Sequence, residues 1–267
     1  MKLKSPRILQ NWFVVSFCFF LQITSAQAEP QRSVYEVNPL VDGAIIGVTG
    51  LSASLVYLYG DRWIHQKCPC GPNDINAFDR GAVGNSNTTL DTISDITVGL
   101  AVLAPPILDA IDLGMTKEFE EDLFVYAETF SMNSFLVTFA KYTVQRPLPR
   151  TVAGDPTLVH SAGGYRSFYS GHTSTFFSTL STAAITLNLR YHQGIWPWLI
   201  VIGLGASVGV ERVAAGRHFP SDVIVGALAG TAVGVFVPFF HQKPDSRVLF
   251  TAAPIEDGAM LFGKLNF

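Results

Sequence analysis

Three short clusters in this sequence combine cations, small residues and histidines in a pattern that could move a phosphoryl group. The clusters cover residues 141–150, 168–174 and 211–222. Displacement at phosphorus spreads negative charge over three equatorial oxygens, so such a site needs fixed cations and N–H donors. The clusters supply these groups in the form of Lys141, Arg146, Ser170, Gly171, His172, Arg212, His218 and Asp222.

The two histidines and the aspartate can carry the covalent steps. A neutral imidazole is a nucleophile toward phosphorus, and we assign this role to His218. Asp222, four residues on, is expected to accept the other ring N–H and so fix the tautomer. His172 is expected to protonate the departing alkoxide and then to take a proton from the attacking water. The sequence therefore predicts transfer through a phosphohistidine.

The remaining groups can hold the phosphate. Lys141, Arg146 and Arg212 supply positive charge, while Ser170 and Gly171 begin an apolar run whose first amides can bind an anion. The proposed chemistry needs neither a metal ion nor another cofactor. Each cluster alone has an ordinary explanation, such as a snorkelling lysine or a routine i,i+4 pair. Three together, in a chain with only 15% charged residues, favour a site.

The elements that must position these groups are apolar. The 267 residues are 48% hydrophobic, with a mean hydropathy of +0.31, so too little charge is present to solvate a large surface. A membrane or near-membrane protein is therefore the first hypothesis. The net charge of −3, without a basic block, argues against nucleic acid as a partner.

Six apolar segments predict six helices in an all-α bundle embedded in a membrane. Three glycines in the last segment, Gly226, Gly230 and Gly234, repeat every four residues, so they share a helix face that a neighbouring backbone can approach closely. The predicted helices cover residues 39–59, 93–112, 120–144, 173–191, 195–212 and 221–241.

The two ends of the chain differ from this helical region. Residues 1–28 have the basic start, short apolar core and Ala-Gln-Ala pattern of a secretory signal peptide. Residues 29–241 would then form the helical domain, and residues 242–267 a short C-terminal extension with two short strands. Cys68 and Cys70 are expected to form a local turn rather than a metal site, because further ligands are not evident nearby. The expected location is a bacterial cell envelope, with the inner membrane favoured.

Over about residues 90–240 the sequence resembles the type 2 phosphatidic acid phosphatase superfamily. The family pattern is a Lys, six residues and Arg-Pro, then Pro-Ser-Gly-His, then Ser-Arg, five residues, His, three residues and Asp. Here Arg212, His218 and Asp222 match the third motif, and Ser170-Gly171-His172 matches the second. The resemblance implies a core of six helices, His218 as nucleophile, His172 as acid and base, and no metal.

Three positions depart from that pattern. Tyr169 and Glu211 stand where the family often has Pro and Ser, which puts mainly the substrate preference in doubt. In the first motif, Leu148 stands where the Arg is expected. Arg146 lies two residues earlier and Arg150 two residues later, and we assign the missing cation to Arg146 with Arg150 as the alternative. Loss of one such contact would cost about 2–4 kcal/mol of transition-state stabilisation.

The resemblance implies a metal-independent phosphatase for lipid phosphates, such as phosphatidate, phosphatidylglycerol phosphate, polyprenyl diphosphate or lipid A. A soluble periplasmic acid phosphatase of the same superfamily and a non-catalytic lipid-phosphate-binding envelope protein are the alternatives. A vanadium-dependent haloperoxidase ranks below them, because those chains are usually longer. The side of the membrane that the site faces stays open, since a cleaved signal and six crossings would place the end of the third helix inside.

Overall fold

The structure is a computed structural model that describes residues 33–66, 68, 70–243, 248–255 and 258–265. The predicted signal peptide at residues 1–28 lies outside the described residues. For residues 248–255 and 258–265 the structure describes the backbone strands only.

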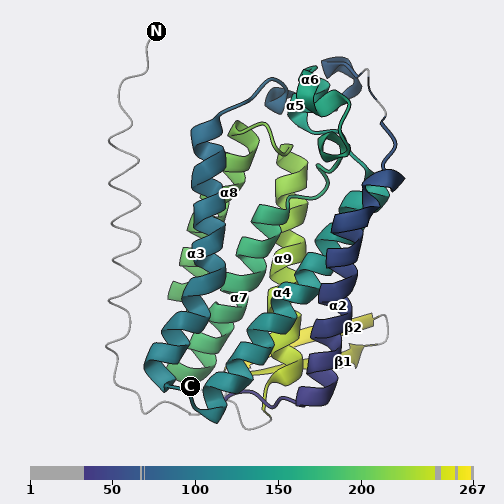
Figure 1. The fold of residues 1–267 in the computed structure, drawn as a ribbon. Helices are drawn as coiled ribbons and strands as arrows, with labels where there is room; N and C mark the ends of the chain where they lie inside the picture. Colours follow the sequence, from purple (N-terminus) through teal and green to yellow (C-terminus); the bar gives the residue numbers. More distant parts are fainter. Residues whose placement is uncertain (1–32, 67, 69, 244–247, 256–257, 266–267) are drawn as a thin grey trace.

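In the described part of the chain, six long helices run up and down in a single bundle (Figure 1). The predicted all-α bundle of six helices is therefore confirmed. The helices are α2 (Pro39–Tyr59), α3 (Thr88–Leu113), α4 (Lys117–Val144), α7 (Gly171–Tyr191), α8 (Trp196–Ala214) and α9 (Pro220–His241).

The starts of these helices follow local sequence signals. Asn38, Asn87, Thr116 and Ser170 each precede a helix, and their side-chain oxygens accept hydrogen bonds from backbone N–H groups of the first turn. Helices α8 and α9 instead carry a proline within their first two positions, where the missing N–H is not needed.

Short elements fill the connectors and the C-terminal region. The α2–α3 connector contains the 3-10 turns η2 (Gly60–Trp63), η3 (Pro72–Asp74) and η4 (Arg80–Ala82). The α4–α7 connector contains α5 (Pro149–Val152), α6 (Pro156–Val159) and η5 (Ala162–Tyr165). Strands β1 (Val248–Ile255) and β2 (Gly258–Leu265) pair antiparallel. Because the helices alternate in direction, the α2–α3, α4–α7 and α8–α9 connectors meet at one end of the bundle (Figure 1).

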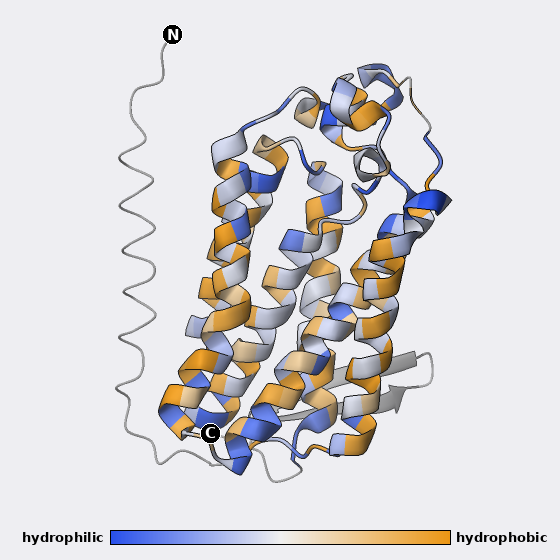
Figure 2. Ribbon diagram, viewed as in Figure 1, coloured by the Kyte–Doolittle hydropathy of each residue, from blue (hydrophilic) through white to orange (hydrophobic). Residues whose placement is uncertain are grey.

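The bundle carries apolar side chains on its outside and many polar ones inside. Leu51, Ile111 and Leu228 are exposed on outer helices, whereas Ser174 and Thr182 of α7 are fully buried. The hydropathy colouring shows the same contrast between the outer helices and the paler α7 (Figure 2). Among the residues that the structure describes, four helical segments are long and apolar enough to cross a membrane: Pro39–Trp63, Thr88–Leu113, Trp196–Ala214 and Pro220–His241. This surface is that of an integral membrane protein.

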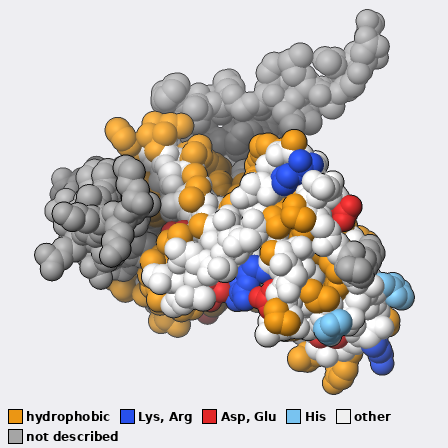
Figure 3. Space-filling view, turned by 90° about the horizontal axis from the view of Figure 1, so that it is seen from above, with side chains coloured by type: hydrophobic (Ala, Val, Ile, Leu, Met, Phe, Trp, Pro, Cys, Tyr) orange, Lys and Arg blue, Asp and Glu red, His pale blue; other side chains and the backbone are white. Residues whose placement is uncertain are grey.

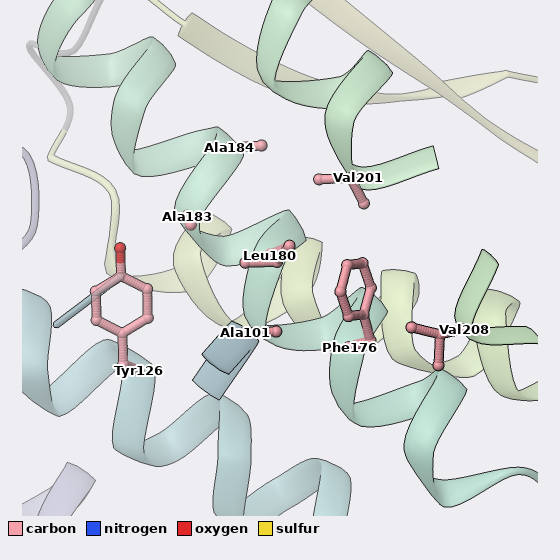
Figure 4. Packing of buried hydrophobic residues seen from close by; sticks show 8 residues of the cluster. All are labelled: Ala101, Tyr126, Phe176, Leu180, Ala183, Ala184, Val201 and Val208. Atoms are coloured by element: carbon pink, nitrogen blue, oxygen red, sulfur yellow. The ribbon is translucent and has the colours of Figure 1, made fainter. Parts of the chain in front are cut away.

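Helix α7 is the centre of the packing. Its Phe176 and Leu180 contact apolar residues of the neighbouring helices in a buried cluster (Figure 4). The other members are Ala101, Tyr126, Ala183, Ala184, Val201 and Val208.

The glycine stripe of α9 lies against the backbone of α7. A Cβ on Gly230 would lie 2.2 Å from the Ser174 carbonyl oxygen, and one on Gly234 would lie 2.2 Å from the Ser178 carbonyl oxygen. Gly226 makes the same approach to Ser170, where a Cβ would lie 2.7 Å from the carbonyl oxygen. The close approach predicted from the glycine spacing is therefore present, and it holds the start of α7 against the start of α9.

Candidate active site

The three clusters come together at the end of the bundle where the α2–α3, α4–α7 and α8–α9 connectors meet. Viewed from that end, basic and acidic side chains lie next to one another near the middle of the face (Figure 3). Lys141 comes from the last turn of α4, His172 from the first turn of α7, and Arg212 from the last turn of α8. His218 lies in the short α8–α9 connector, two residues before α9 begins.

His218 is buried and has one ring nitrogen available for chemistry. Its Nδ1 lies 2.8 Å from the Ser167 carbonyl oxygen, so Nδ1–H donates there and Nε2 keeps its lone pair. Burial lowers the pKa of His218 well below its ordinary value, and the positive charges of Lys141 and Arg212 lower it further. The ring is therefore neutral near pH 7, as a nucleophile must be.

Asp222 has a different contact from the one expected. We predicted that it accepts the ring N–H of His218, but its Oδ2 lies 4.0 Å from His218 Nδ1. Instead it accepts hydrogen bonds from the Ser167 hydroxyl at 2.6 Å and from the Phe219 amide at 2.9 Å. Asp222 thus positions the two residues on either side of the imidazole, and the Ser167 carbonyl fixes the tautomer.

Arg146 also differs from the prediction. We expected its guanidinium to replace the phosphate-binding Arg that is absent at position 148. Its two terminal nitrogens instead pair with Asp222 at 2.5 Å and with Asp79 at 2.8 Å, and its guanidinium lies 4.1 Å from the centre of the Phe219 ring. These contacts make Arg146 a clamp that holds the start of α9, because both carboxylates are buried and would otherwise carry uncompensated charge.

Asp79 is a site residue that the sequence reasoning missed. It lies fully buried in the α2–α3 connector and accepts hydrogen bonds from the backbone N–H and hydroxyl of Ser221, at 2.9 and 2.7 Å. Burial by itself would raise the pKa of Asp79, but the hydrogen bonds from Arg146 and Ser221 outweigh it and lower the pKa to about 2. The α2–α3 connector is polar, so its sequence does not distinguish this one buried carboxylate from the exposed ones.

His172 has a carboxylate partner that was also missed. Its Nε2 lies 2.7 Å from Asp95 Oδ1, and Asp95 comes from the second turn of α3. The sequence analysis counted Asp95 only as a charge within an apolar segment. A carboxylate in this place orients the ring, which positions it for proton transfer.

Two cations remain available for an anion. Within the described residues, Lys141 Nζ pairs with no carboxylate, and it lies beside Gly171, where a Cβ would be 3.8 Å from it. Arg212 uses Nη1 for Asp91 at 2.7 Å and Ser94 at 2.9 Å, while its buried Nε has no hydrogen-bond partner there. A buried N–H without an acceptor is costly, so its orientation indicates a place for an anion.

Ser170 and Gly171 form the start of α7, and Arg166 adds a further cation. The Ser170 hydroxyl accepts from the Thr173 amide, and the Ser170 amide donates to the Asp222 carbonyl oxygen at 3.0 Å. Arg166 Nη1 donates to the Tyr142 hydroxyl at 2.8 Å and to Asp61 Oδ1 at 3.1 Å. The sequence analysis did not assign a role to Arg166.

Residues 122–245 match the family model of the PAP2 superfamily. The matched segment, a little under half of the chain, is similar to the PAP2 superfamily. All of the second and third motif residues, and Lys141 of the first, lie within the matched segment.

Curated relatives are similar over parts of the chain. A probable diacylglycerol pyrophosphate phosphatase of Schizosaccharomyces pombe is 32% identical over 36% of this chain and 38% of its own. The lipid A 4'-phosphatase of Porphyromonas gingivalis is 34% identical over 40% of this chain and 43% of that relative. The lipid A 1-phosphatase of the same organism is 25% identical over 77% of this chain and 40% of that relative. The chain thus spans about two fifths of the length of these relatives.

Two solved structures are also similar to this chain. The LpxE structure of Aquifex aeolicus shares 27% identity over 59% of this chain and 90% of its own, with a TM-score of 0.43. A transmembrane PAP2 type phosphatidylglycerolphosphate phosphatase of Bacillus subtilis shares 18% identity over 74% of this chain and 94% of its own, with a TM-score of 0.45.

The departure from the PAP2 pattern at Leu148 has a structural explanation. Leu148 is buried, and its amide donates to the Gly164 carbonyl oxygen at 2.9 Å, so it anchors the α4–α7 connector. Cys68 and Cys70 form a disulfide with each other, which leaves neither thiolate for a metal ion.

Proposed function

We propose that this protein is a lipid phosphatase that works through a phosphohistidine on His218. The observation that carries the proposal is the buried, neutral His218 ring with Nε2 free beside Lys141 and Arg212. Attack by Nε2 forms a P–N bond and breaks the ester P–O bond, while His172 protonates the departing alkoxide. Water then attacks phosphorus, His172 takes its proton, and inorganic phosphate leaves.

The protein itself supplies the positive charge for these steps. Lys141, Arg212 and the amides at the start of α7 balance the charge that develops on the phosphoryl oxygens. For this reason the proposed reaction uses no metal ion and no other cofactor.

A lipid substrate is supported by the surroundings of His172. An open cavity of about 360 Å³ borders this residue and is lined mainly by apolar side chains of α3 and α4, among them Val98, Leu103 and Phe130. Its position would place an acyl or prenyl chain against the apolar side of the bundle and the phosphate at the cluster of cations. Phosphatidate, phosphatidylglycerol phosphate, polyprenyl diphosphate and lipid A phosphates all fit this description.

Phosphate release tests the proposal. The purified protein in detergent micelles is expected to release phosphate from at least one of these lipids, and His218→Ala is expected to abolish that release. His160→Ala, an exposed histidine of the α4–α7 connector, is the matched control and should keep full activity. Tight lipid binding without turnover in the unaltered protein would favour the non-catalytic binder, and retained activity in His218→Ala would refute the mechanism.

We propose the cell envelope as its location, with the inner membrane favoured over a soluble periplasmic form. The exposed leucines and isoleucines of the outer helices support this, because they would otherwise contact water. Retention in the membrane pellet after an alkaline carbonate wash is expected. Release into the supernatant would favour the soluble acid phosphatase instead.

A further inference from the structure

Three ligand-type side chains meet inside the bundle at the end opposite the candidate active site. Asp42 comes from the first turn of α2, Glu128 from α4, and His241 is the last residue of α9. All three are buried, at 6%, 4% and 8% exposure, and their ligand atoms lie within 4.8 Å of one another. Along α9, His241 is about 28 Å from Asp222, so this cluster is separate from the phosphate site.

The hydrogen bonds around the cluster leave one atom of each side chain directed inward. His241 Nδ1 lies 2.8 Å from the Val237 carbonyl oxygen and donates to it, so Nε2 faces the two carboxylates. Asp42 Oδ2 accepts a hydrogen bond from the Asn38 backbone amide at 2.7 Å, so Oδ1 is the oxygen left to face the cluster. Glu128 Oε2 is buried and has no hydrogen-bond partner among the described residues. A histidine whose second nitrogen binds a backbone carbonyl is a typical metal ligand.

Charge and spacing favour a divalent cation in the middle. Two buried carboxylates with one imidazole carry a net charge of −2, or −1 if the ring is protonated, whereas a divalent ion neutralises the cluster. His241 Nε2 is 3.5 Å from Asp42 Oδ1 and 3.5 Å from Glu128 Oε2. Ligands about 2.1 Å from a tetrahedral Zn²⁺ lie about 3.4 Å apart.

We propose that Asp42, Glu128 and His241 bind a divalent transition-metal ion, with Zn²⁺ the best match. An imidazole with carboxylates suits Zn²⁺ better than the all-oxygen sites of Mg²⁺ or Ca²⁺. A cavity of about 640 Å³ reaches the cluster and includes Asp42 and His241 among its lining, which gives the ion a route and leaves a position for water. The ion would tie the start of α2 and the end of α9 to α4, so its role is structural.

Metal uptake by the intact protein in detergent tests this proposal. Tag-free protein is dialysed against a chelator, freed of it and titrated with Zn²⁺, with calorimetry for affinity and elemental analysis for stoichiometry. One Zn²⁺ per chain and a raised Tm are expected. Loss of a hydrogen-bond partner of a metal ligand costs about 10- to 100-fold in affinity, so Glu128→Gln and His241→Gln should each weaken binding at least that much. Glu120→Gln and His65→Gln, both exposed, are the matched controls.

A second measurement does not depend on whether those variants fold. Co²⁺ added to the unaltered protein should give the intense visible absorption of a four-coordinate site, and Zn²⁺ should displace it. A spectrum like that of Co²⁺ in water, or equal Zn²⁺ uptake by His241→Gln and the unaltered protein, would overturn the proposal. If the histidine is held between the two carboxylates and binds no metal, the spectrum will be that of Co²⁺ in water. His218→Ala should bind Zn²⁺ normally, which separates this test from that of the phosphatase.

Discussion

Replacing Asp79 with Asn is expected to reduce stability and phosphatase activity together. Asp79 is fully buried and holds both Arg146 and the first turn of α9 through Ser221. The substitution keeps the shape of the side chain but removes its charge, so Arg146 loses one of its two carboxylates. The next residue affected is Asp222, which shares Arg146 and holds Ser167 and Phe219 beside the His218 ring.

The size of the effect follows from the ion pair. The pKa of Asp79 is lowered from an ordinary 3.8 to about 2, and at about 1.4 kcal/mol per pKa unit this corresponds to roughly 2 kcal/mol. Breaking a buried pair by removing one partner costs about 3–5 kcal/mol. We therefore expect a loss of about 2–4 kcal/mol, which lowers the Tm by roughly 5–15 °C for a chain of this size.

The assay compares thermal unfolding and phosphate release in the same detergent. Asp74→Asn is the matched control, because Asp74 lies in the same connector but is exposed, and it should change the Tm little. The lowered pKa also sets the pH dependence: the stabilisation from Asp79 is present above about pH 4 and is lost as the pH falls toward 2. A Tm and a kcat equal to those of the unaltered protein would refute the role assigned to Asp79.

Three further predictions concern other parts of the account. Gly230→Ala places a Cβ 2.2 Å from the Ser174 carbonyl oxygen and should lower the free energy of unfolding by at least about 1–3 kcal/mol, seen as a lower Tm. Gly203→Ala, with open space around its Cβ, is the control and should cause no loss of stability. Equal Tm values for the two variants would contradict the packing argument. Asp95→Ala removes the 2.7 Å contact to His172 and a 3.3 Å contact to Arg212, and it should lower kcat by up to the 10²–10⁴-fold that acid–base catalysis supplies; a change in KM alone would refute this. Because the pKa of His218 is lowered, protonation of His218 should reduce kcat/KM only at a pH well below the ordinary histidine value of about 6.5. Folding stability should begin to fall as the pH drops below that ordinary value. A fall of kcat/KM at pH 6.5 or above that disappears only in His172 variants would leave His218 unassigned as nucleophile.

The helices could be predicted from the sequence because their signals are local. Apolar runs place each helix within a few residues of its observed ends, and the spacing of Gly226, Gly230 and Gly234 predicts the contact with α7. The PAP2 motifs likewise identify His172, His218 and Arg212 by order and spacing alone.

The partners of these residues could not be predicted in the same way. Which carboxylate pairs with Arg146 depends on how the α2–α3 connector folds over the end of the bundle, and Asp79 is 67 residues away in sequence. The pairing of Asp95 with His172 depends on the rotation of α3 against α7. Asp42, Glu128 and His241 form no motif at all, because three helices bring them together.

The most direct test of the central claim is to trap the covalent intermediate. The protein is mixed with a lipid phosphate, quenched rapidly in alkali, where phosphohistidine is stable, digested and analysed by mass spectrometry. The account predicts a phosphoryl group on His218, accumulating further in His172→Ala with an activated aryl phosphate, because a good leaving group needs no acid while hydrolysis still needs the base. Phosphate found on another residue, or turnover with no phosphoenzyme under these conditions, would contradict the account.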